Sequence, residues 1–234
     1  MALLLQLAAL LLLALRPGTA APAPSVIQRV GTELGRAAGV VFSLSSWITN
    51  YETAPYTVTE QAEAGWEERL YPASNWVCTS QQEGENPDAQ RSSMFWSLFQ
   101  YIQGENEAGV KMDMTTPVST LRMDGMLEMC FYLGTEHQTS PPSPTLDGVF
   151  IKAEASRRLV TRGRPGWMDE TSWRAEAREL QALLATSGRN LAQDRWVECT
   201  AADNTDILYL SYYMVGYDAP SKLWNRRNEV WFLV

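Results

Sequence analysis

The sequence predicts an α+β protein in which strands stand before and after each of two helices. Residues 91–103 and 170–186 repeat apolar side chains three or four positions apart, which is the spacing of one helix face. The segments around them alternate polar and apolar residues or are rich in β-branched and aromatic residues, as strands are. Strands on both sides of single helices favour an antiparallel or mixed sheet with the helices on one side.

The first half of the chain contains several strand-like segments. They are residues 56–60, 66–71, 75–80, 111–116 and 127–133. Gly65 separates the first two, and a polar loop at residues 81–90 leads to the helix. Pro117 has no N–H for a strand ladder, so the fourth strand is expected to bulge, lie at an edge or end there. The fifth strand alternates and places one set of apolar side chains on a single face: Leu127, Met129, Phe131 and Leu133.

The first helix has more apolar surface than packing on one sheet requires. Met94, Leu98 and Ile102 form one stripe, and Phe95 and Phe99 form a second stripe beside it. A surface helix needs only one apolar stripe of about 100° to reach its core. The helix is therefore expected to have a sheet on one side and a second apolar neighbour on the other. That neighbour is a ligand, a protein partner or more of the core.

The second half repeats the order of elements after a proline-containing loop at residues 134–148. Strands are predicted at residues 149–153, 158–162, 207–215 and 229–234, with an additional strand at 195–199. The helix at 170–186 can be capped by Asp169 and ended by Gly188. The two halves therefore share the same order of elements, although their amino-acid sequences are not repeats of one another.

The N-terminus has the pattern of a signal peptide at residues 1–20. Ala2–Leu15 is almost wholly apolar and would rise about 21 Å as a helix, which is short of a bilayer core of about 30 Å. Small residues at Gly18 and Ala20 favour cleavage after Ala20 or Ala21. The alternative is an uncleaved anchor, because no Lys or Arg precedes the apolar run. Residues 21–46 are expected to be partly disordered or to form a short helix.

The charge balance excludes some classes of partner. The chain has 19 basic and 27 acidic residues, a net charge of −8. Nucleic acids and anionic membrane surfaces both require a basic face, so neither is expected as the main partner. No stretch after the N-terminus has the length of a membrane span. The mature protein is expected to be a soluble, secreted monomer.

The three cysteines leave the disulfide pattern open. Cys78, Cys130 and Cys199 allow one disulfide with a spare thiol, or no disulfide. Their spacing matches no zinc motif, so no metal site is predicted.

No arrangement of residues indicates an enzyme. His137 is the single histidine, and it lies in a polar stretch before the proline loop. The chain has no Gly-x-Ser-x-Gly elbow, no HExxH and no glycine-rich phosphate loop. We therefore predict no catalytic residues, and His137 is interpreted as a surface residue.

Two separated motifs identify a family resemblance. The first comprises Tyr101–Asn106, which reads YIQGEN, and Lys111–Val118, which reads KMDMTTPV. The second comprises Gly216–Lys222 and Asn225–Trp231 near the C-terminus. Both resemble the SOUL family of haem-binding proteins, in the same order, and the resemblance covers residues 47–234. It implies a distorted β-barrel of two pseudo-repeated strand–helix–strand halves, flanked by two long helices.

The resemblance also implies a haem site beside the first helix. Phe95 and Phe99 would form the wall of an apolar cleft. Lys222 lies where a family lysine faces a haem propionate, and Arg91 is beside Ser92, which aligns with the arginine at the helix start of relatives. For the haem iron no axial ligand is predicted. Three methionines could serve, although core packing is the commoner role of such residues: Met94, Met112 and Met114.

The sequence therefore predicts a secreted, non-enzymatic protein that binds haem or a related tetrapyrrole in an apolar cleft. The alternative is a secreted interaction module that keeps the SOUL fold but binds a protein partner or another apolar ligand.

Overall fold

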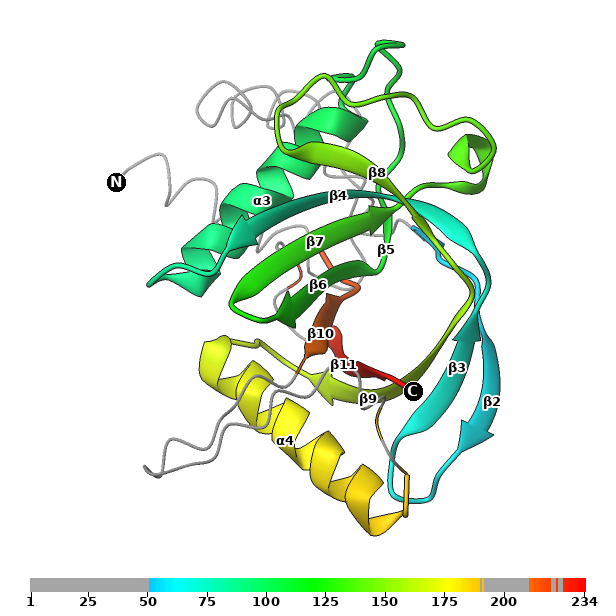
Figure 1. Cartoon of the computed structure of the whole chain (residues 1–234), viewed down its shortest axis with the longest axis vertical. Helices are drawn as coiled ribbons and strands as arrows, with labels where there is room; N and C mark the ends of the chain where they lie inside the picture. The colour runs from blue at the N-terminus through cyan, green and yellow to red at the C-terminus, as the bar shows by residue number, and fades with distance from the viewer. Residues whose placement is uncertain (1–50, 190, 192–210, 220–221, 223–224) are drawn as a thin grey trace, which may run out of the picture. The chain divides into compact units, whose positions relative to one another are not determined.

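The computed structural model describes residues 51–189, 191, 211–219, 222 and 225–234. This part of the chain forms one curled, nine-stranded antiparallel sheet with two long helices on its outer face (Figure 1). The predicted α+β class is confirmed. The predictions for residues 1–20, 21–46 and 195–199, and the first residues of the strand expected at 207–215, lie outside the described residues.

The sheet has the order β2-β3-β9-β11-β10-β6-β7-β4-β8. A separate parallel pair, β1 and β5, lies outside it. The strands are β1 (Glu52–Thr53), β2 (Thr57–Gln61), β3 (Glu67–Tyr71), β4 (Ser74–Gln82), β5 (Thr115–Thr116), β6 (Val118–Met123), β7 (Met126–Tyr132), β8 (Val149–Glu154), β9 (Arg157–Pro165), β10 (Tyr212–Gly216) and β11 (Arg227–Leu233). A short 3₁₀ turn, η2 (Thr135–His137), follows β7.

Both helices begin at side-chain caps. Helix α3 (Pro87–Ile102) starts four residues before the predicted stretch, because the Asn86 side chain accepts a hydrogen bond from the Ala89 N–H and Pro87 occupies the first turn. Helix α4 (Glu170–Thr186) has the predicted bounds, and Asp169 caps it through the Ser172 N–H at 2.8 Å. Helix α3 packs on β4 and β7, and helix α4 packs on β11.

Most predicted strands are confirmed, but the one at residues 111–116 is wrong for most of its length. Only Thr115–Thr116 pair with another strand. Met112 is buried while Lys111 and Asp113 are exposed, so the alternation reflects a chain that packs one side on the core without a ladder partner. Its end at Pro117 agrees with the prediction.

Strand β6 was not predicted, although it lies at the centre of the sheet. The strand has no polar/apolar alternation because residues on both of its faces are buried, from Ser119 to Arg122. A strand covered on both faces carries no period-two signal. Its polar side chains also make the segment hard to recognise as a buried strand from the sequence.

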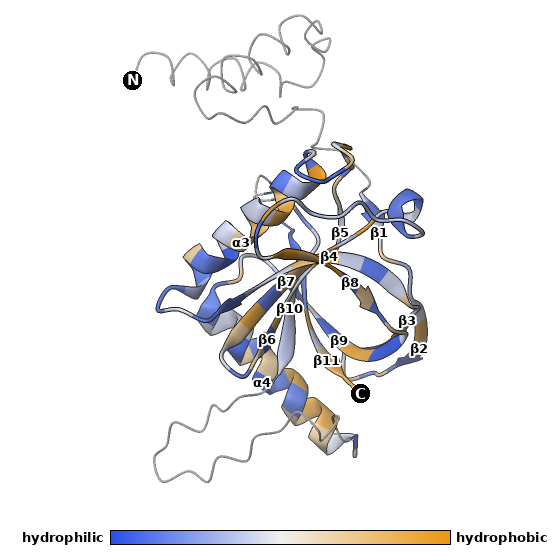
Figure 2. Ribbon diagram, turned by 45° about the horizontal axis from the view of Figure 1, so that its top comes forward, coloured by the Kyte–Doolittle hydropathy of each residue, from blue (hydrophilic) through white to orange (hydrophobic). Residues whose placement is uncertain are grey.

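Two apolar clusters cover the two faces of the sheet. The outer cluster joins the helices to the strands through Met94, Leu98, Phe131, Leu180 and Leu184, among others. The inner cluster is aromatic, with side chains that include Tyr71, Trp76, Tyr213 and Trp231. Figure 2 shows hydrophobic residues recurring between hydrophilic ones along the strands and along α4. Strands β4, β6, β7, β9, β10 and β11 therefore contribute side chains to both clusters.

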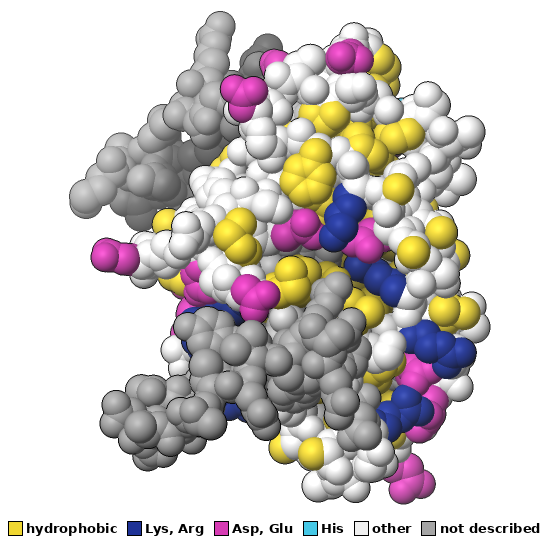
Figure 3. Space-filling view, in the orientation of Figure 1, with side chains coloured by type: hydrophobic (Ala, Val, Ile, Leu, Met, Phe, Trp, Pro, Cys, Tyr) yellow, Lys and Arg dark blue, Asp and Glu magenta, His cyan; other side chains and the backbone are white. Residues whose placement is uncertain are grey.

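Within the described residues, no helix has the length and apolar composition needed to cross a membrane. On the face shown in Figure 3, acidic and basic side chains of the described residues are interspersed.

Candidate functional site

Helix α3 carries a partly exposed aromatic surface beside the stripe that it buries against the sheet. Met94 and Leu98 are fully buried beneath it, as predicted for the first apolar stripe. Phe95 and Phe99, the second stripe, are only half-buried, and Trp96 keeps 40% of its surface exposed. In the described part of the chain, this second stripe is therefore not absorbed into the core.

The three rings form an ordered cluster, which we call the α3 aromatic cluster (Phe95, Trp96 and Phe99). The Phe95 and Phe99 rings are stacked, with centroids 6.0 Å apart and an interplanar angle of 15°. Trp96 stands nearly perpendicular to both, at centroid distances of 5.7 and 5.4 Å. Phe95 also contacts Phe131 of β7, with centroids 5.2 Å apart. The cluster is thus anchored to the sheet through Phe95, while Trp96 keeps 40% of its surface exposed.

Trp96 belongs to this cluster but was not among the predicted site residues. Its position three residues before Phe99 could have predicted its role, because side chains with that spacing lie on neighbouring turns of one helix surface. Its exposure makes it the most accessible large apolar side chain of the helix.

Arg91 faces helix α4. Its Nη1 atom lies 3.1 Å from Glu170 Oε2, it forms a second ion pair with Asp88, and 13% of its side chain is exposed. Glu170 also accepts hydrogen bonds from Arg122 and Arg174. Burial alone would raise the pKa of Glu170, but these arginines outweigh burial and lower it. Arg91 therefore links the two helices, and a haem propionate would have to compete with Glu170 for it.

Lys222 is the more accessible of the two predicted cations. Its Nζ atom lies 2.6 Å from Asp218 Oδ1, and 42% of its side chain is exposed. The loop that carries it is held by Arg226, whose guanidinium donates to the carbonyl oxygens of Ala219 and Lys222 at 2.8 and 2.9 Å. The same guanidinium lies 4.4 Å from the centre of the Trp167 ring.

Strand register relates the Lys222 loop to the α3 aromatic cluster. Phe131, which contacts Phe95, is paired with Val118 of β6, and Val118 is paired with Gly216 of β10. Neighbouring strands are about 4.8 Å apart, so the loop after Gly216 begins roughly 10 Å from the strand beneath Phe95. Of the four predicted site residues, Phe95 and Phe99 touch one another. Arg91 lies one turn before Phe95, and Lys222 comes from this separate loop.

The three methionines that could have served as iron ligands are core residues, in line with the commoner role of such residues. Met94 and Met112 are buried in the outer cluster, and Met114 is partly buried against it. The exposed and half-exposed positions of α3 carry no His, Met, Cys or Tyr. His137 lies in η2, with Nε2 3.1 Å from Glu136 Oε1. The residues of the α3 surface therefore fit contact with a flat apolar ring, with no side chain placed to ligate a metal in it.

The first family motif contributes a structural turn after α3. Asn106 is buried, and its side-chain amide donates to the carbonyl oxygens of Tyr101 and Val110 at 3.0 and 2.8 Å. Its Oδ1 atom accepts from the Val110 N–H at 3.1 Å. These three bonds hold the chain reversal that brings residues 110–112 back along the helix end.

The second motif supplies a buried ionic cluster on the inner face of the sheet. Glu229 is buried and accepts hydrogen bonds from Arg69 Nη1 at 2.6 Å, from the Tyr217 hydroxyl at 2.8 Å and from Trp231 Nε1 at 2.8 Å. Burial would raise the pKa of Glu229, but Arg69, the Trp231 N–H and the charge of Arg227 lower it to about 2. The motif thus ties β11 and the start of the Lys222 loop to β3.

The sequence left open which cysteines, if any, form a disulfide, and the structure answers this for two of them. Cys78 of β4 and Cys130 of β7 form a disulfide between directly opposed residues on the inner face. Cys199 lies outside the described residues.

Comparison with known proteins places the chain in a family. The family model described as SOUL heme-binding protein matches residues 51–233. Human heme-binding protein 2 is 29% identical over 192 residues, which cover 78% of this chain and 85% of that protein. Pig heme-binding protein 1 is 27% identical over 199 residues, covering 81% and 96%.

Solved structures are more distant. The C-terminal domain of EcmrR aligns over 76% of this chain and 96% of that one, at 13% identity and a TM-score of 0.48. The family match, which spans nearly all the described residues, is decisive: the chain belongs to the SOUL heme-binding protein family.

Proposed function

We propose that this protein binds haem or a related tetrapyrrole non-covalently against the α3 aromatic cluster. The observation that carries the proposal is the half-exposed arrangement of Phe95, Trp96 and Phe99 above a fully buried stripe. The names of its relatives, heme-binding proteins 1 and 2, support the same ligand class.

The chemistry of the cluster suits a large flat ligand. A tetrapyrrole is an apolar plate with carboxylates at one edge, and such ligands bind to apolar surfaces with a few polar groups at the rim. The aromatic cluster supplies apolar contact, and Lys222 supplies a half-exposed cation for a carboxylate. When bound, haem contributes its own iron chemistry. The residues of this chain bind and orient the plate, and no group on the α3 surface moves a proton or attacks a substrate, so the proposed role is binding without catalysis.

A haemin titration with matched variants tests the proposal. Wild-type protein should show a saturable Soret shift at one equivalent. Phe99→Ala should weaken binding by about 1–3 kcal/mol, and Trp96→Ala by a similar amount, because each removes aromatic area from the contact. Lys222→Ala should cost less, about 0.5–1 kcal/mol, and less again at high salt, because the lysine is solvated. His137→Ala should leave binding unchanged.

The chain offers a control for the aromatic variants. Phe150 of β8 is 37% exposed, and its pairing opposite Cys78 places it on the inner face. Phe150→Ala should retain wild-type affinity. Equal weakening in this control, or wild-type affinity in Phe99→Ala and Trp96→Ala, would place the haem elsewhere. A wild-type protein that shows no Soret shift would favour the interaction-module alternative.

We also propose that the mature protein is secreted as a monomer. The apolar run at Ala2–Leu15 supports export. The Cys78–Cys130 disulfide is in keeping with it, since disulfides persist in oxidising compartments. N-terminal sequencing of protein from the medium should give a start near Ala21, and a start at Met1 would contradict the proposal.

We infer that the two halves of the domain are architectural repeats that complete a distorted barrel. Along the chain, helix α3 follows β4 and precedes the β6–β7 pair, and helix α4 follows β9 and precedes the β10–β11 pair. Strands β6 and β10 adjoin at the centre of the sheet. This order supports a pseudo-twofold relation between the halves.

A further inference from the structure

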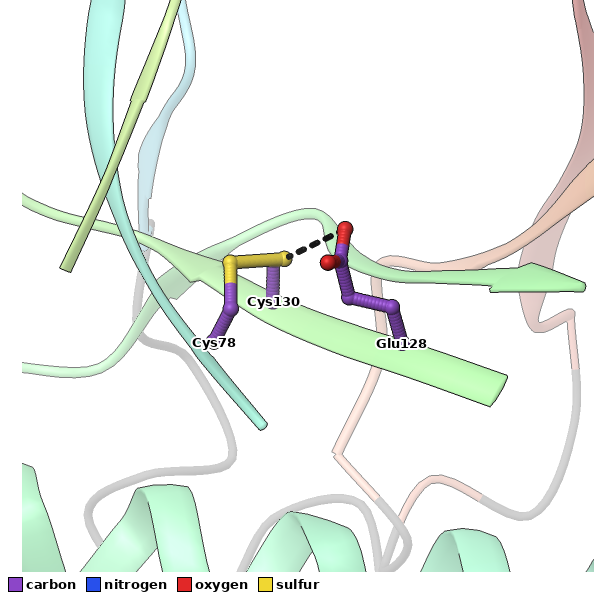
Figure 4. Close-up of side chains that lie close together, drawn as sticks. All are labelled: Cys78, Glu128 and Cys130. Carbon is purple, nitrogen blue, oxygen red and sulfur yellow. Dashed lines mark hydrogen bonds between the residues drawn. A yellow bond between two sulfur atoms is a disulfide. The ribbon is translucent and has the colours of Figure 1, made fainter. Parts of the chain in front are cut away.

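The inner face of the sheet holds a group of metal-ligating side chains, which we call the Cys78–Cys130–Glu128 cluster. Cys78 and Cys130 are opposed across β4 and β7, and Glu128 precedes Cys130 by two residues, so its side chain lies on the same face. The Cys130 sulfur lies 3.9 Å from Glu128 Oε1. The ligand atoms of all three residues lie within 4.8 Å of one another (Figure 4).

We propose that reduction of the Cys78–Cys130 disulfide converts this cluster into a Zn²⁺ site. A dithiol reductant supplies two electrons and two protons, becomes a disulfide itself, and leaves one thiol on each cysteine. Zn²⁺ then binds both sulfurs as thiolates, and the two thiol protons pass to solvent. The Glu128 carboxylate is the third ligand and a water molecule is the fourth, which is the three-ligand arrangement of an open zinc site.

The spacing of the cluster suits tetrahedral zinc. With Zn–S bonds of about 2.3 Å and a Zn–O bond of about 2.0–2.2 Å, the two sulfurs would lie roughly 3.8 Å apart and each sulfur roughly 3.5 Å from the carboxylate oxygen. The Cys130–Glu128 separation of 3.9 Å is already close to that value. After reduction the two sulfurs need only move apart across one pair of neighbouring strands, where Cβ atoms stand about 4.5–5.5 Å apart.

The surroundings provide access and charge balance. Cys78 is fully buried and Cys130 is 7% exposed, whereas 21% of the Glu128 side chain is exposed, so an ion would enter from the Glu128 side. The three ligands carry one negative charge more than Zn²⁺ neutralises. Lys152 supplies the missing positive charge: its Nζ atom lies 2.6 Å from Glu128 Oε1 and 2.8 Å from Glu154. When Glu128 turns one oxygen to the metal, Lys152 stays beside the site, because Arg157 also neutralises Glu154 at 3.3 Å.

Cobalt titration of the full chain tests the site, in a Cys199→Ser background that removes the third cysteine. The protein is reduced with an immobilised phosphine, freed of reductant under argon and titrated with Co²⁺. One equivalent should produce a thiolate-to-cobalt charge-transfer band and the visible bands of tetrahedral cobalt, and Zn²⁺ should bleach both. The oxidised protein should show neither band. Circular dichroism should show that the reduced protein keeps its sheet.

Variants separate a built site from loose thiol binding. Cys78→Ser and Cys130→Ser should each abolish the charge-transfer band at one equivalent. Glu128→Gln should weaken Co²⁺ binding by at least about tenfold, the smallest effect typical of losing even an outer-shell partner. The exposed Glu107→Gln is the control and should bind as wild type. The proposal is overturned if the bands are missing in folded reduced protein, if they survive in Cys78→Ser, if Glu128→Gln binds unchanged, or if reduction unfolds the sheet.

Discussion

The buried Arg69–Glu229 pair should give the protein a distinctive pH dependence of stability. Glu229 is 3% exposed and its pKa is lowered from 4.5 to about 2 in the folded state. A depressed carboxylate pKa stabilises the fold fully above the unfolded pKa of 4.5, and that contribution is lost as the pH falls through the folded value. At 1.36 kcal/mol for each pKa unit, Glu229 contributes about 3 kcal/mol, and this should disappear between pH 4.5 and pH 2.

The substitution Glu229→Gln isolates this contribution. At pH 7 the variant should be less stable by about 3 kcal/mol, because it removes the Glu229 charge from the buried Arg69 guanidinium, which keeps only its second carboxylate partner, Glu67. Glutamine does not titrate, so the difference in free energy of unfolding between wild type and variant should shrink as the pH falls from 4.5 towards 2. Urea denaturation followed by tryptophan fluorescence at several pH values gives both curves.

A control variant and the shape of the two curves decide whether this reasoning holds. Glu107→Gln, at an exposed carboxylate, should follow the wild-type curve at every pH. If the Glu229→Gln and wild-type curves stay parallel from pH 7 to pH 2, the pKa of Glu229 is not depressed in the folded state. The buried ion pair would then not be the source of the acid sensitivity.

Three other outcomes follow from the structure. Asn106→Ala should lower the free energy of unfolding by about 2–3 kcal/mol in urea denaturation, because it strips hydrogen bonds from a buried turn; a change below the error of the measurement would contradict the role of this turn. Reduction of Cys78–Cys130, which closes a loop across a sequence separation of 52, should cost about 2–4 kcal/mol, and an identical urea midpoint with and without reductant would refute it. Arg91→Gln should weaken haemin binding less than Lys222→Gln, because Arg91 is 13% exposed and paired with two acidic side chains, whereas Lys222 is 42% exposed and paired with one; the reverse order would show that Arg91 reaches the ligand.

Local signals explain which elements could be predicted. Helix α4 has its predicted bounds because its cap, Asp169, and its apolar stripe both lie within the helix or next to it. The alternating strand around Leu127–Leu133 is confirmed for the same reason, since one of its faces belongs to the outer cluster. Strand β6 could not be predicted, because burial on both faces removes the alternation that marks a strand.

Part of the candidate site could likewise be predicted from local spacing, and part depends on contacts between distant residues. The stripe of Phe95 and Phe99 was visible in the helical spacing, and the structure stacks these rings. The partner of Arg91 was not visible, because Glu170 lies 79 residues away in the chain. A side chain that looks like a free cation in the sequence can therefore be held by an acid that only the packing of two helices brings to it.

The sequence alone determined the α+β class, the extent of α4, the family and the aromatic character of α3, because periodicity, caps and motifs are properties of neighbouring residues. Only the tertiary structure decided the pairings between distant residues. Among the three cysteines it joined Cys78 to Cys130, and it placed Arg69 on Glu229, 160 residues away. Such pairs depend on which strands adjoin in the sheet, and strand order is set by the packing of the whole chain rather than by any local pattern.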